Sequence, residues 1–220
     1  MTDESVSCPL CGYLGARARL VGPLGLAYRR CPRCALIAMV PESLPDPESE
    51  RARYLTHQNG PQYPGHVAFL RRAIDPTLPH LRPGARALDY GCGPVPTLSV
   101  VLRGEGFACE DYDPFFFCEL PAGPFDAVFA TEVVEHMHHP GEELARIVGL
   151  LRPGGLFTLM TEPWTEVATF ADWYYARDPT HVVFYHERTI AYLCAAYGLT
   201  VLEHPEPRVW VLTQGDGCRR

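Results

Sequence analysis

The amino-acid sequence predicts an α/β protein with a doubly wound, mostly parallel sheet and a small zinc ribbon at its N-terminus. From residue 85 onward, apolar runs of strand length alternate with helical segments, which is typical of a sheet covered by helices on both faces. Two Cys-x-x-Cys pairs precede them at the spacing of a metal-binding ribbon. We expect a ribbon over 1–40, a connector with N-terminal helices over 41–84, and the sheet domain over 85–220.

The composition of the 220 residues argues against several classes of protein. Hydrophobic residues make up 47% and charged residues 20%, which is usual for a globular chain. No apolar run approaches the roughly 20 residues that span a bilayer, and the first residues lack the features of a signal peptide. We therefore expect a cytoplasmic protein with no membrane segment. The formal net charge of −7 argues against a general nucleic-acid binder, although residues 1–40 contain five arginines and two acidic residues.

The four N-terminal cysteines predict a structural zinc site. Cys8 and Cys11 form one pair, Cys31 and Cys34 form the other, and nineteen residues separate the pairs. Four sulfur ligands complete a tetrahedral site and leave no open position for chemistry. A module this small buries too little core to fold alone, so the metal is expected to be its nucleus.

The helices and strands follow from periodicity and from the position of proline and glycine. The connector has room for short helices at 48–55 and 66–74. The helix that begins at Pro140 is well defined, because residues 153–155 are Pro-Gly-Gly and stop it. In the sheet domain, strands are expected at 85–90, 107–111, 125–130, 155–161, 199–203 and 208–213, and helices at 96–103, 132–138, 140–151 and 187–197.

One strand of the usual doubly wound order is expected to be absent. Only the twelve residues from Asp113 to Pro124 lie between the second expected strand and the next one. A crossover helix with a further strand needs more chain than that. The third strand is therefore predicted to be missing or vestigial.

A strand that runs into a glycine turn and then a helix marks the expected ligand site. The segment reads Ala87-Leu88-Asp89-Tyr90-Gly91-Cys92-Gly93-Pro94, and such turns bind ligands in open α/β sheets. A dinucleotide would need free amides for its pyrophosphate, but Pro94 has no N–H and Asp89 adds negative charge. These residues favour a cationic ligand such as S-adenosylmethionine, and a nicotinamide dinucleotide is the minor alternative.

Three motifs over residues 85–161 resemble those of class I S-adenosylmethionine-dependent methyltransferases. Residues 88–93 resemble motif I of that family, in which Val95 stands here at the position of the usual third glycine. Phe125-Asp126-Ala127-Val128 with the following Glu132-Val133-Val134-Glu135-His136 resembles the fourth-strand motif. Leu151-Arg152-Pro153-Gly154-Gly155 resembles the turn before strand five.

Two further stretches resemble a subgroup of that family with an N-terminal zinc ribbon. They are Tyr54-Leu55-Thr56-His57 and the residues from Asp178 to Tyr185. With them, the resemblance extends over most of the chain.

The resemblance implies a role for each residue of the cofactor site. Asp89, Gly91 and Gly93 would line the methionyl part, and the carboxylate of Asp111 would bind the ribose hydroxyls. Tyr112 would pack beside the adenine. The residues implied to lie under the sulfonium are Ala130, Thr131 and Glu132.

A catalytic base is needed only if the acceptor must lose a proton, because methyl transfer is a direct displacement. Candidate bases form two clusters, in which a single histidine is more often structural. The clusters are Glu132, Glu135, His136, His138 and His139, and then Asp178, His181, Tyr185 and His186. An aromatic run either lines the acceptor pocket or forms a core flap. It consists of Trp164, Phe170, Trp173, Tyr174 and Tyr175.

A second metal site is a further hypothesis for the first cluster. On a helix, Glu132, Glu135 and His136 would share one face, and His181 could complete the set. Two carboxylates and two imidazoles suit Mg²⁺ or Mn²⁺. The arrangement resembles the metal site of small-RNA ribose 2′-O-methyltransferases and the Glu-x-x-Glu-His run of quinone-pathway O-methyltransferases. The alternative is that the run only caps and packs a helix, and convergence of the four side chains decides between the two.

The expected function is an S-adenosylmethionine-dependent methyltransferase that acts on a small-molecule acceptor, most simply at oxygen. One alternative is a binding protein led by the ribbon, with a degenerate methyltransferase scaffold; Val95 and the missing strand favour it. Another is an RNA ribose O-methyltransferase that docks RNA on the basic ribbon, where Tyr13 and Tyr28 are the available stacking residues. The sequence specifies neither the acceptor nor the oligomeric state.

Overall fold

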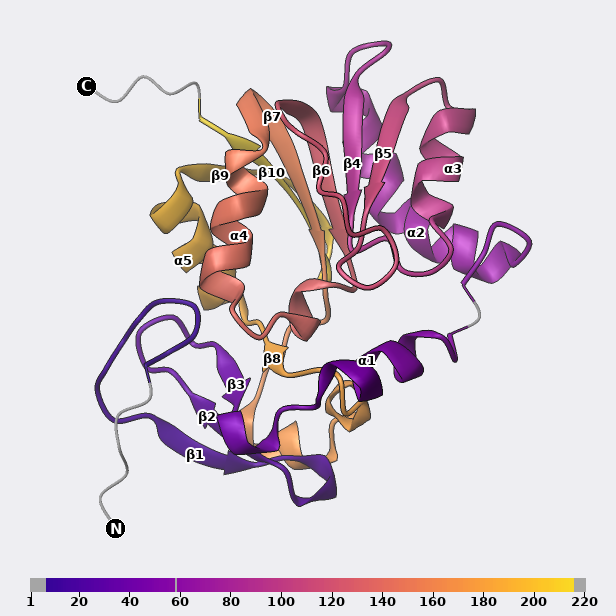
Figure 1. Ribbon diagram of the computed structural model, residues 1–220. Coiled ribbons are helices and arrows are strands. Elements are labelled where there is room, and N and C mark those ends of the chain that lie inside the picture. The colour runs from indigo at the N-terminus through magenta and orange to yellow at the C-terminus, as the bar shows by residue number, and fades with distance from the viewer. Residues whose placement is uncertain (1–6, 58, 216–220) are drawn as a thin grey trace.

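The computed structural model describes residues 7–57 and 59–215, which form a large sheet with helices on both faces and a smaller sheet at one end (Figure 1). The large sheet has the strand order β5-β4-β6-β7-β10-β9. The first four strands are parallel, and β10 runs antiparallel to both β7 and β9. The strand bounds are β4 Arg86–Tyr90, β5 Ala108–Tyr112, β6 Phe125–Thr131, β7 Leu151–Met160, β9 Leu199–Glu206 and β10 Val209–Gln214. The predicted α/β class is confirmed.

Helices α2 and α3 lie on one face of this sheet, and α4 and α5 lie on the other (Figure 1). In α4, Pro140 starts the helix, and Leu144, Ile147 and Val148 are buried at helical spacing against the sheet. The helix bounds are α1 Pro47–Tyr54, α2 Pro64–Thr77, α3 Thr97–Gly104, α4 Pro140–Gly149 and α5 Glu187–Tyr197. Short 3-10 turns are η1 Pro23–Gly25, η2 Pro41–Ser43, η3 Leu78–His80, η4 Val134–His136, η5 Val167–Asp172 and η6 Tyr174–Arg177.

The expected gap in the sheet is confirmed. β5 is an edge strand, and the residues from Asp113 to Pro124 contain a single isolated bridge between Asp113 and Phe117 in place of a strand. The short segment therefore returns directly from β5 to the start of β6.

The helix predicted at 132–138 is wrong. β6 continues to Thr131, Glu132 adopts a left-handed backbone with φ +54°, and one 3-10 turn follows. The left-handed residue breaks the helical path, so the side chains of Glu132 and His136 do not share a helix face. The helix predicted at 140–151 ends at Gly149, because Leu151 already belongs to β7.

The small sheet combines the N-terminal segment with a strand from much later in the chain. Its order is β1-β2-β3-β8, where β1 is Ala18–Val21, β2 Ala27–Arg30, β3 Ile37–Met39 and β8 Val183–Phe184. The fully buried ring of Tyr28 lies 5.1 Å from Phe170 and 5.8 Å from Phe184, measured between ring centroids. The sheet therefore packs on residues that follow β7, and its core is continuous with that of the large sheet.

The described helices include none with the length and apolar character needed to cross a membrane.

Candidate cofactor and acceptor site

A cavity of about 920 Å³ lies at the carboxyl ends of the parallel strands. One half is lined by the glycine turn after β4 and the loop after β5. The other half is lined by α1, by the residues around η4 and by the segment before β8. In Figure 1, α1 lies across this end of the sheet. The edge where loops meet in an open α/β sheet is where ligands bind.

The glycine turn after β4 has a backbone that glycine adopts without strain. Gly91 has φ +81° and Gly93 has φ +67°. A Cβ atom on Gly91 would lie 2.5 Å from the methyl carbons of Val133, so close packing also requires glycine there. The amide of Gly91 donates to the carbonyl of Tyr112 at 2.7 Å, and that of Gly93 donates to Asp113 at 2.9 Å. The turn is thus tied to the end of β5.

Asp89 is buried at the end of β4 and lines the cavity. Burial raises the pKa of its carboxyl well above the usual range, and the negative charges of Asp111 and Asp113 raise it further. A cationic group bound beside these three carboxyls would relieve their repulsion.

Asp111 and Asp113 face different surroundings. Asp111 accepts a hydrogen bond from Arg103 of α3 at 2.8 Å and is not among the described residues that line the cavity. Asp113 lines the cavity, and its two carboxylate oxygens accept the amides of Gly93 at 2.9 Å and Phe115 at 2.8 Å. Because β5 extends one residue beyond its predicted end, the tip of the strand presents Asp113. Sequence reasoning missed this residue, although an Asp-Pro turn directly after a strand is a usable signal.

The other expected cofactor residues lie at the ends of β5 and β6. Tyr112 lines the cavity, with its ring 4.9 Å from the ring of Tyr90. Thr131 and Glu132 also line it, whereas Ala130 is fully buried and is not among the described lining residues. Six of the seven residues predicted to bind the cofactor therefore border one cavity, and Asp111 does not.

Burial and neighbouring charges act in opposite directions on the pKa of the Glu132 carboxyl. Its Oε2 lies 3.2 Å from the hydroxyl oxygen of Tyr175, and its Oε1 lies 3.6 Å from the guanidinium of Arg208. Burial raises the pKa of Glu132 to about 8, and the charge of Glu135 adds to the shift.

Glu135 is fully buried and is not among the described lining residues. Its Oε1 accepts from the hydroxyl of Tyr175 at 2.6 Å, and its Oε2 accepts from Thr161 at 2.9 Å. Burial raises its pKa to about 7, although both hydrogen bonds favour the charged form. Both oxygens have protein partners and the side chain does not border the cavity, which together favour a structural role for this carboxyl.

His136 and His181 face the cavity as a pair, with ring centroids 4.7 Å apart. Nδ1 of His136 lies 2.8 Å from the carbonyl oxygen of Thr180, and Nδ1 of His181 lies 2.7 Å from that of Tyr175. A carbonyl only accepts, so both Nδ1 atoms carry the proton and both Nε2 atoms keep a lone pair. Burial lowers the pKa of both rings, to about 3 for His181, where the nearby His136 adds to the effect.

The four residues of the hypothetical second metal site do not all converge. Ligand atoms of Glu135, His136 and His181 lie within 4.8 Å of one another, and Glu132 is outside this group. The predicted helix that would have aligned Glu132 with the others is absent, which explains the difference.

Among the remaining candidate bases, His138, Tyr185 and His186 have structural partners, whereas His139 lines the cavity and makes no side-chain cap bond. His138 bonds to Glu50 at 3.0 Å, His186 caps α5, and the hydroxyl of Tyr185 donates to the carbonyl of Val134 at 3.2 Å. His139 precedes α4 as its N-cap residue.

The aromatic run after β7 forms a core flap. Its members contact one another and the small sheet, and they are not among the described residues that line the cavity. Of the two alternatives drawn from the sequence, the structure favours the flap over an acceptor pocket.

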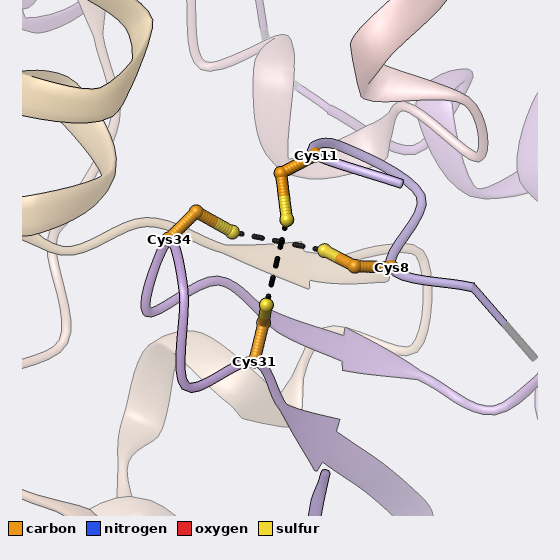
Figure 2. Close-up of side chains that lie close together, drawn as sticks. All are labelled: Cys8, Cys11, Cys31 and Cys34. Atoms are coloured by element: carbon orange, nitrogen blue, oxygen red, sulfur yellow. Dashed lines mark hydrogen bonds between the residues drawn. The ribbon is translucent and has the colours of Figure 1, made fainter. Parts of the chain in front are cut away.

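Figure 2 shows the sulfur atoms of the four N-terminal cysteines pointing toward a common centre. All four sulfurs lie within 4.8 Å of one another. The separations are 3.6 Å between Cys8 and Cys34 and 3.5 Å between Cys11 and Cys31. Tetrahedral zinc with bonds of about 2.3 Å would hold its sulfurs at about 3.8 Å, so the cluster needs little movement to fit the ion.

Comparison with known proteins gives a family match over much of the chain. A family model described as a methyltransferase domain matches residues 62–204. Two curated relatives are ubiquinone biosynthesis O-methyltransferases from Caulobacter. The protein of Caulobacter vibrioides is 50% identical over 100 residues, which cover 43% of this chain and 33% of the relative. That of Caulobacter sp. strain K31 is 55% identical over 40 residues, 18% and 16% of the respective chains. The matched part thus spans a third or less of either relative.

Solved structures support the fold. The 1,6-didemethyltoxoflavin-N1-methyltransferase of Burkholderia thailandensis, solved with 1,6-didemethyltoxoflavin and S-adenosylhomocysteine, aligns with a TM-score of 0.52. The alignment covers 90% of this chain and 99% of that protein at 18% identity. At this identity the likeness concerns the fold alone.

Proposed function

The chain belongs to the methyltransferase domain family, and we propose that it transfers a methyl group from S-adenosylmethionine to a hydroxyl oxygen of a small-molecule acceptor. One observation carries the proposal: a single cavity joins the glycine turn and Asp113 to the paired histidines His136 and His181. Both halves that methyl transfer requires, a cofactor site and an acceptor site, therefore open into one space.

The cofactor half fits S-adenosylmethionine through its shape and charge. The bound cofactor would supply an electrophilic methyl group on a sulfonium. Asp113 is the carboxyl best placed to accept hydrogen bonds from the ribose hydroxyls, because it lies at the tip of β5 beside the glycine turn. Asp89 would favour the cationic end of the cofactor. This proposal keeps the role expected for Asp89 and moves the ribose contact from Asp111 to Asp113.

In the acceptor half, two imidazole Nε2 atoms offer lone pairs to a hydroxyl. Burial lowers the pKa of His136, but the carbonyl of Thr180 and the charges of Asp178, Glu50 and Asp113 favour its protonated form, and we assign it the proton-accepting role. His181, with a pKa of about 3, accepts a hydrogen bond without taking the proton. Tyr54, whose ring lies 5.2 Å from that of His136, adds an apolar wall. The two Caulobacter relatives are named O-methyltransferases, which supports an oxygen acceptor.

The four cysteines are proposed to bind one structural zinc ion. The donor set is four thiols with no open position, which suits a folding role and no catalytic one. Elemental analysis of the purified protein is expected to find one zinc ion per chain, and its absence would contradict the proposal.

The alternative hypothesis for the acceptor half is that Glu135, His136 and His181 bind a divalent cation. The hydrogen bonds from both Nδ1 atoms to carbonyls are the kind that orient histidine ligands of metals. The occupied oxygens of Glu135 argue against it. Titration with Mn²⁺, measured by the proton relaxation of water, distinguishes a metal site from a pair of metal-free histidines. Tight binding of Mn²⁺ that His181→Asn abolishes would favour the metal site.

Calorimetry with S-adenosylmethionine and S-adenosylhomocysteine tests the proposed function directly. Binding of both, with the cavity as the site, is the expected result. Failure of both ligands to bind would favour the degenerate scaffold that Val95 suggests. If the cofactor binds, assays with a panel of phenols and catechols and with RNA fragments separate a small-molecule enzyme from a ribose O-methyltransferase.

A further inference from the structure

The second cysteine knuckle, residues 31–35, accepts hydrogen bonds from side chains of α5 and of the segment that follows β7. Thr189 of α5 donates from its hydroxyl to the carbonyl of Cys34 at 2.8 Å. The indole N–H of Trp164 donates to the carbonyl of Ala35 at 3.1 Å, and Arg188 donates to that of Pro32 at 3.1 Å. Trp164 is buried and the hydroxyl bond of Thr189 lies in the interior, so both bonds are protected from water.

From this knuckle, a short backbone path leads to the cavity. β3 follows directly and pairs with β8, and the amide of Met39 donates to the carbonyl of Val182 at 2.8 Å. On its other side, the amide of Val182 donates to the carbonyl of Glu135 at 2.8 Å. Val182 therefore bridges β3 and the residue next to His136.

Both histidines are oriented by the same segment. His181 directly precedes Val182, and the carbonyls of Tyr175 and Thr180 fix the two Nδ1 atoms. The bridge at Val182 and the salt bridge of Asp178 with Arg53 of α1, at 2.7 Å, hold this segment in place. The bond from Met39 and the salt bridge of Arg53 come from the first 54 residues, whereas the bond of Val182 to Glu135 lies outside them.

The cofactor half has different supports. The glycine turn is bonded to Tyr112 and Asp113, and its backbone bonds therefore lie within the large sheet and its loops. The hydrogen bonds of the two halves thus involve different parts of the chain, although the ring of Tyr54 lies near both, 5.6 Å from Phe115 and 5.2 Å from His136.

We propose that the metal-bound cysteine cluster positions the acceptor histidines through β3 and β8, with Thr189 and Trp164 as positioning residues, while the cofactor half does not depend on it. This proposal rests on the proposed zinc site and on the proposed acceptor role of the histidines. It assigns the N-terminal module a part in building the acceptor half of the cavity.

The test uses the full chain before and after removal of zinc by EDTA, with two independent measurements. Calorimetry gives the dissociation constant for S-adenosylhomocysteine, which we expect to change by no more than about twofold because the hydrogen bonds of the glycine turn involve no residue of the cysteine module. Nuclear magnetic resonance of the histidine side chains reports the acceptor half. The Hε1 signals of His136 and His181, assigned with His→Asn variants, are expected to move or broaden, and to return when zinc is restored.

Two variants make the same test without touching a cysteine. Thr189→Val and Trp164→Phe remove the bonds to the knuckle, and Thr169→Val is the matched control, because its hydroxyl donates to a carbonyl on the surface, at Glu166. We expect both variants to keep zinc and S-adenosylhomocysteine binding while the two histidine signals shift, and the control to resemble the parent protein.

The outcomes separate this proposal from the proposed function. Unchanged histidine signals after zinc removal, or the absence of zinc from the parent protein, would overturn the coupling. Parallel loss of S-adenosylhomocysteine binding and histidine signals would also overturn it, since the cluster would then hold the whole fold. If the zinc-bound parent does not bind S-adenosylhomocysteine, the proposed methyltransferase function fails instead, and the histidine measurement still stands.

Discussion

The two halves of the cavity are built in different ways. The cofactor half is made by residues at the ends of adjacent strands, and its bonds join positions about twenty residues apart, such as Gly93 and Asp113. The acceptor half joins His136 with Thr180 and Arg53 with Asp178, which are 44 and 125 residues apart. Local turns therefore determine the cofactor half, whereas the acceptor half exists only once the whole chain has folded.

The largest expected effect concerns the tight turn of the cofactor half. Gly91→Ala adds a Cβ in a left-handed backbone, which costs about 1–2 kcal/mol, and displaces Val133, at a further cost of about 1–3 kcal/mol. Gly93→Ala meets the backbone cost alone, because no atom lies within 4 Å of its Cβ position. Urea unfolding of both variants measures the difference. Equal losses of stability would mean that Val133 can move aside and that the turn is less rigid than its contacts indicate.

The second prediction concerns Asp113. Asp113→Asn removes the charge that is proposed to bind the ribose hydroxyls, and we expect S-adenosylhomocysteine affinity to fall by about 2 kcal/mol, roughly thirtyfold. Glu110→Gln is the control, because it removes a carboxylate of the same strand that pairs with Arg86 away from the cavity. Calorimetry measures both, and an unchanged affinity for the Asn variant would remove Asp113 from the cofactor site.

The same difference explains what the sequence could predict. The strands of the large sheet, the missing third strand and the glycine turn follow from patterns within about forty residues, and the structure agrees with them. The cysteine spacing likewise anticipates that four sulfurs meet. These features depend on local periodicity and turn chemistry.

Other features were beyond local reasoning. The left-handed backbone of Glu132 interrupts a run with good helical spacing, because β6 extends further and its end packs on β7. The pairing of β8 with β3 joins strands about 145 residues apart and has no local signal. The carboxylate that borders the cavity comes one residue after β5, whereas the expected end of the strand at residue 111 favoured Asp111.

The third prediction concerns the pH dependence of stability, because burial raises the pKa of Glu132 and lowers that of His181. The pKa of Glu132 is raised to about 8, so between pH 4.5 and 8 the folded state holds a proton that the unfolded state has released. The contribution of Glu132 to the free energy of unfolding therefore falls as pH rises from 4.5 to 8. The lowered pKa of His181, about 3, means that the unfolded state binds a proton first, so stability falls as pH drops from 6.5 to 3.

The two groups can be separated by unfolding in urea at pH 4, 6 and 8. Glu132→Gln is expected to flatten the loss of stability between pH 6 and 8, and His181→Asn to flatten the loss between pH 6 and 4. Each ionisation changes the free energy of unfolding by at most about 1.4 kcal/mol per pH unit. If neither variant alters its slope, the two side chains are more hydrated than their burial indicates.

The smallest expected effect is that of Asp111→Asn. Asp111 lies only two residues from Asp113 but does not border the cavity, so the two variants compare a carboxylate outside the cavity with one inside it. The carboxylate of Asp111 pairs with Arg103, which is about half exposed, and such pairs stabilise a fold by about 1 kcal/mol or less. Loss of this charge also removes the repulsion between Asp111 and the buried carboxyl of Asp89. These contributions oppose each other, so we expect stability to change little and S-adenosylhomocysteine affinity to stay within about twofold of the parent value. An affinity loss as large as that of Asp113→Asn would instead place the ribose at Asp111, as the motif alone implies, and would require the tip of β5 to rearrange when the cofactor binds.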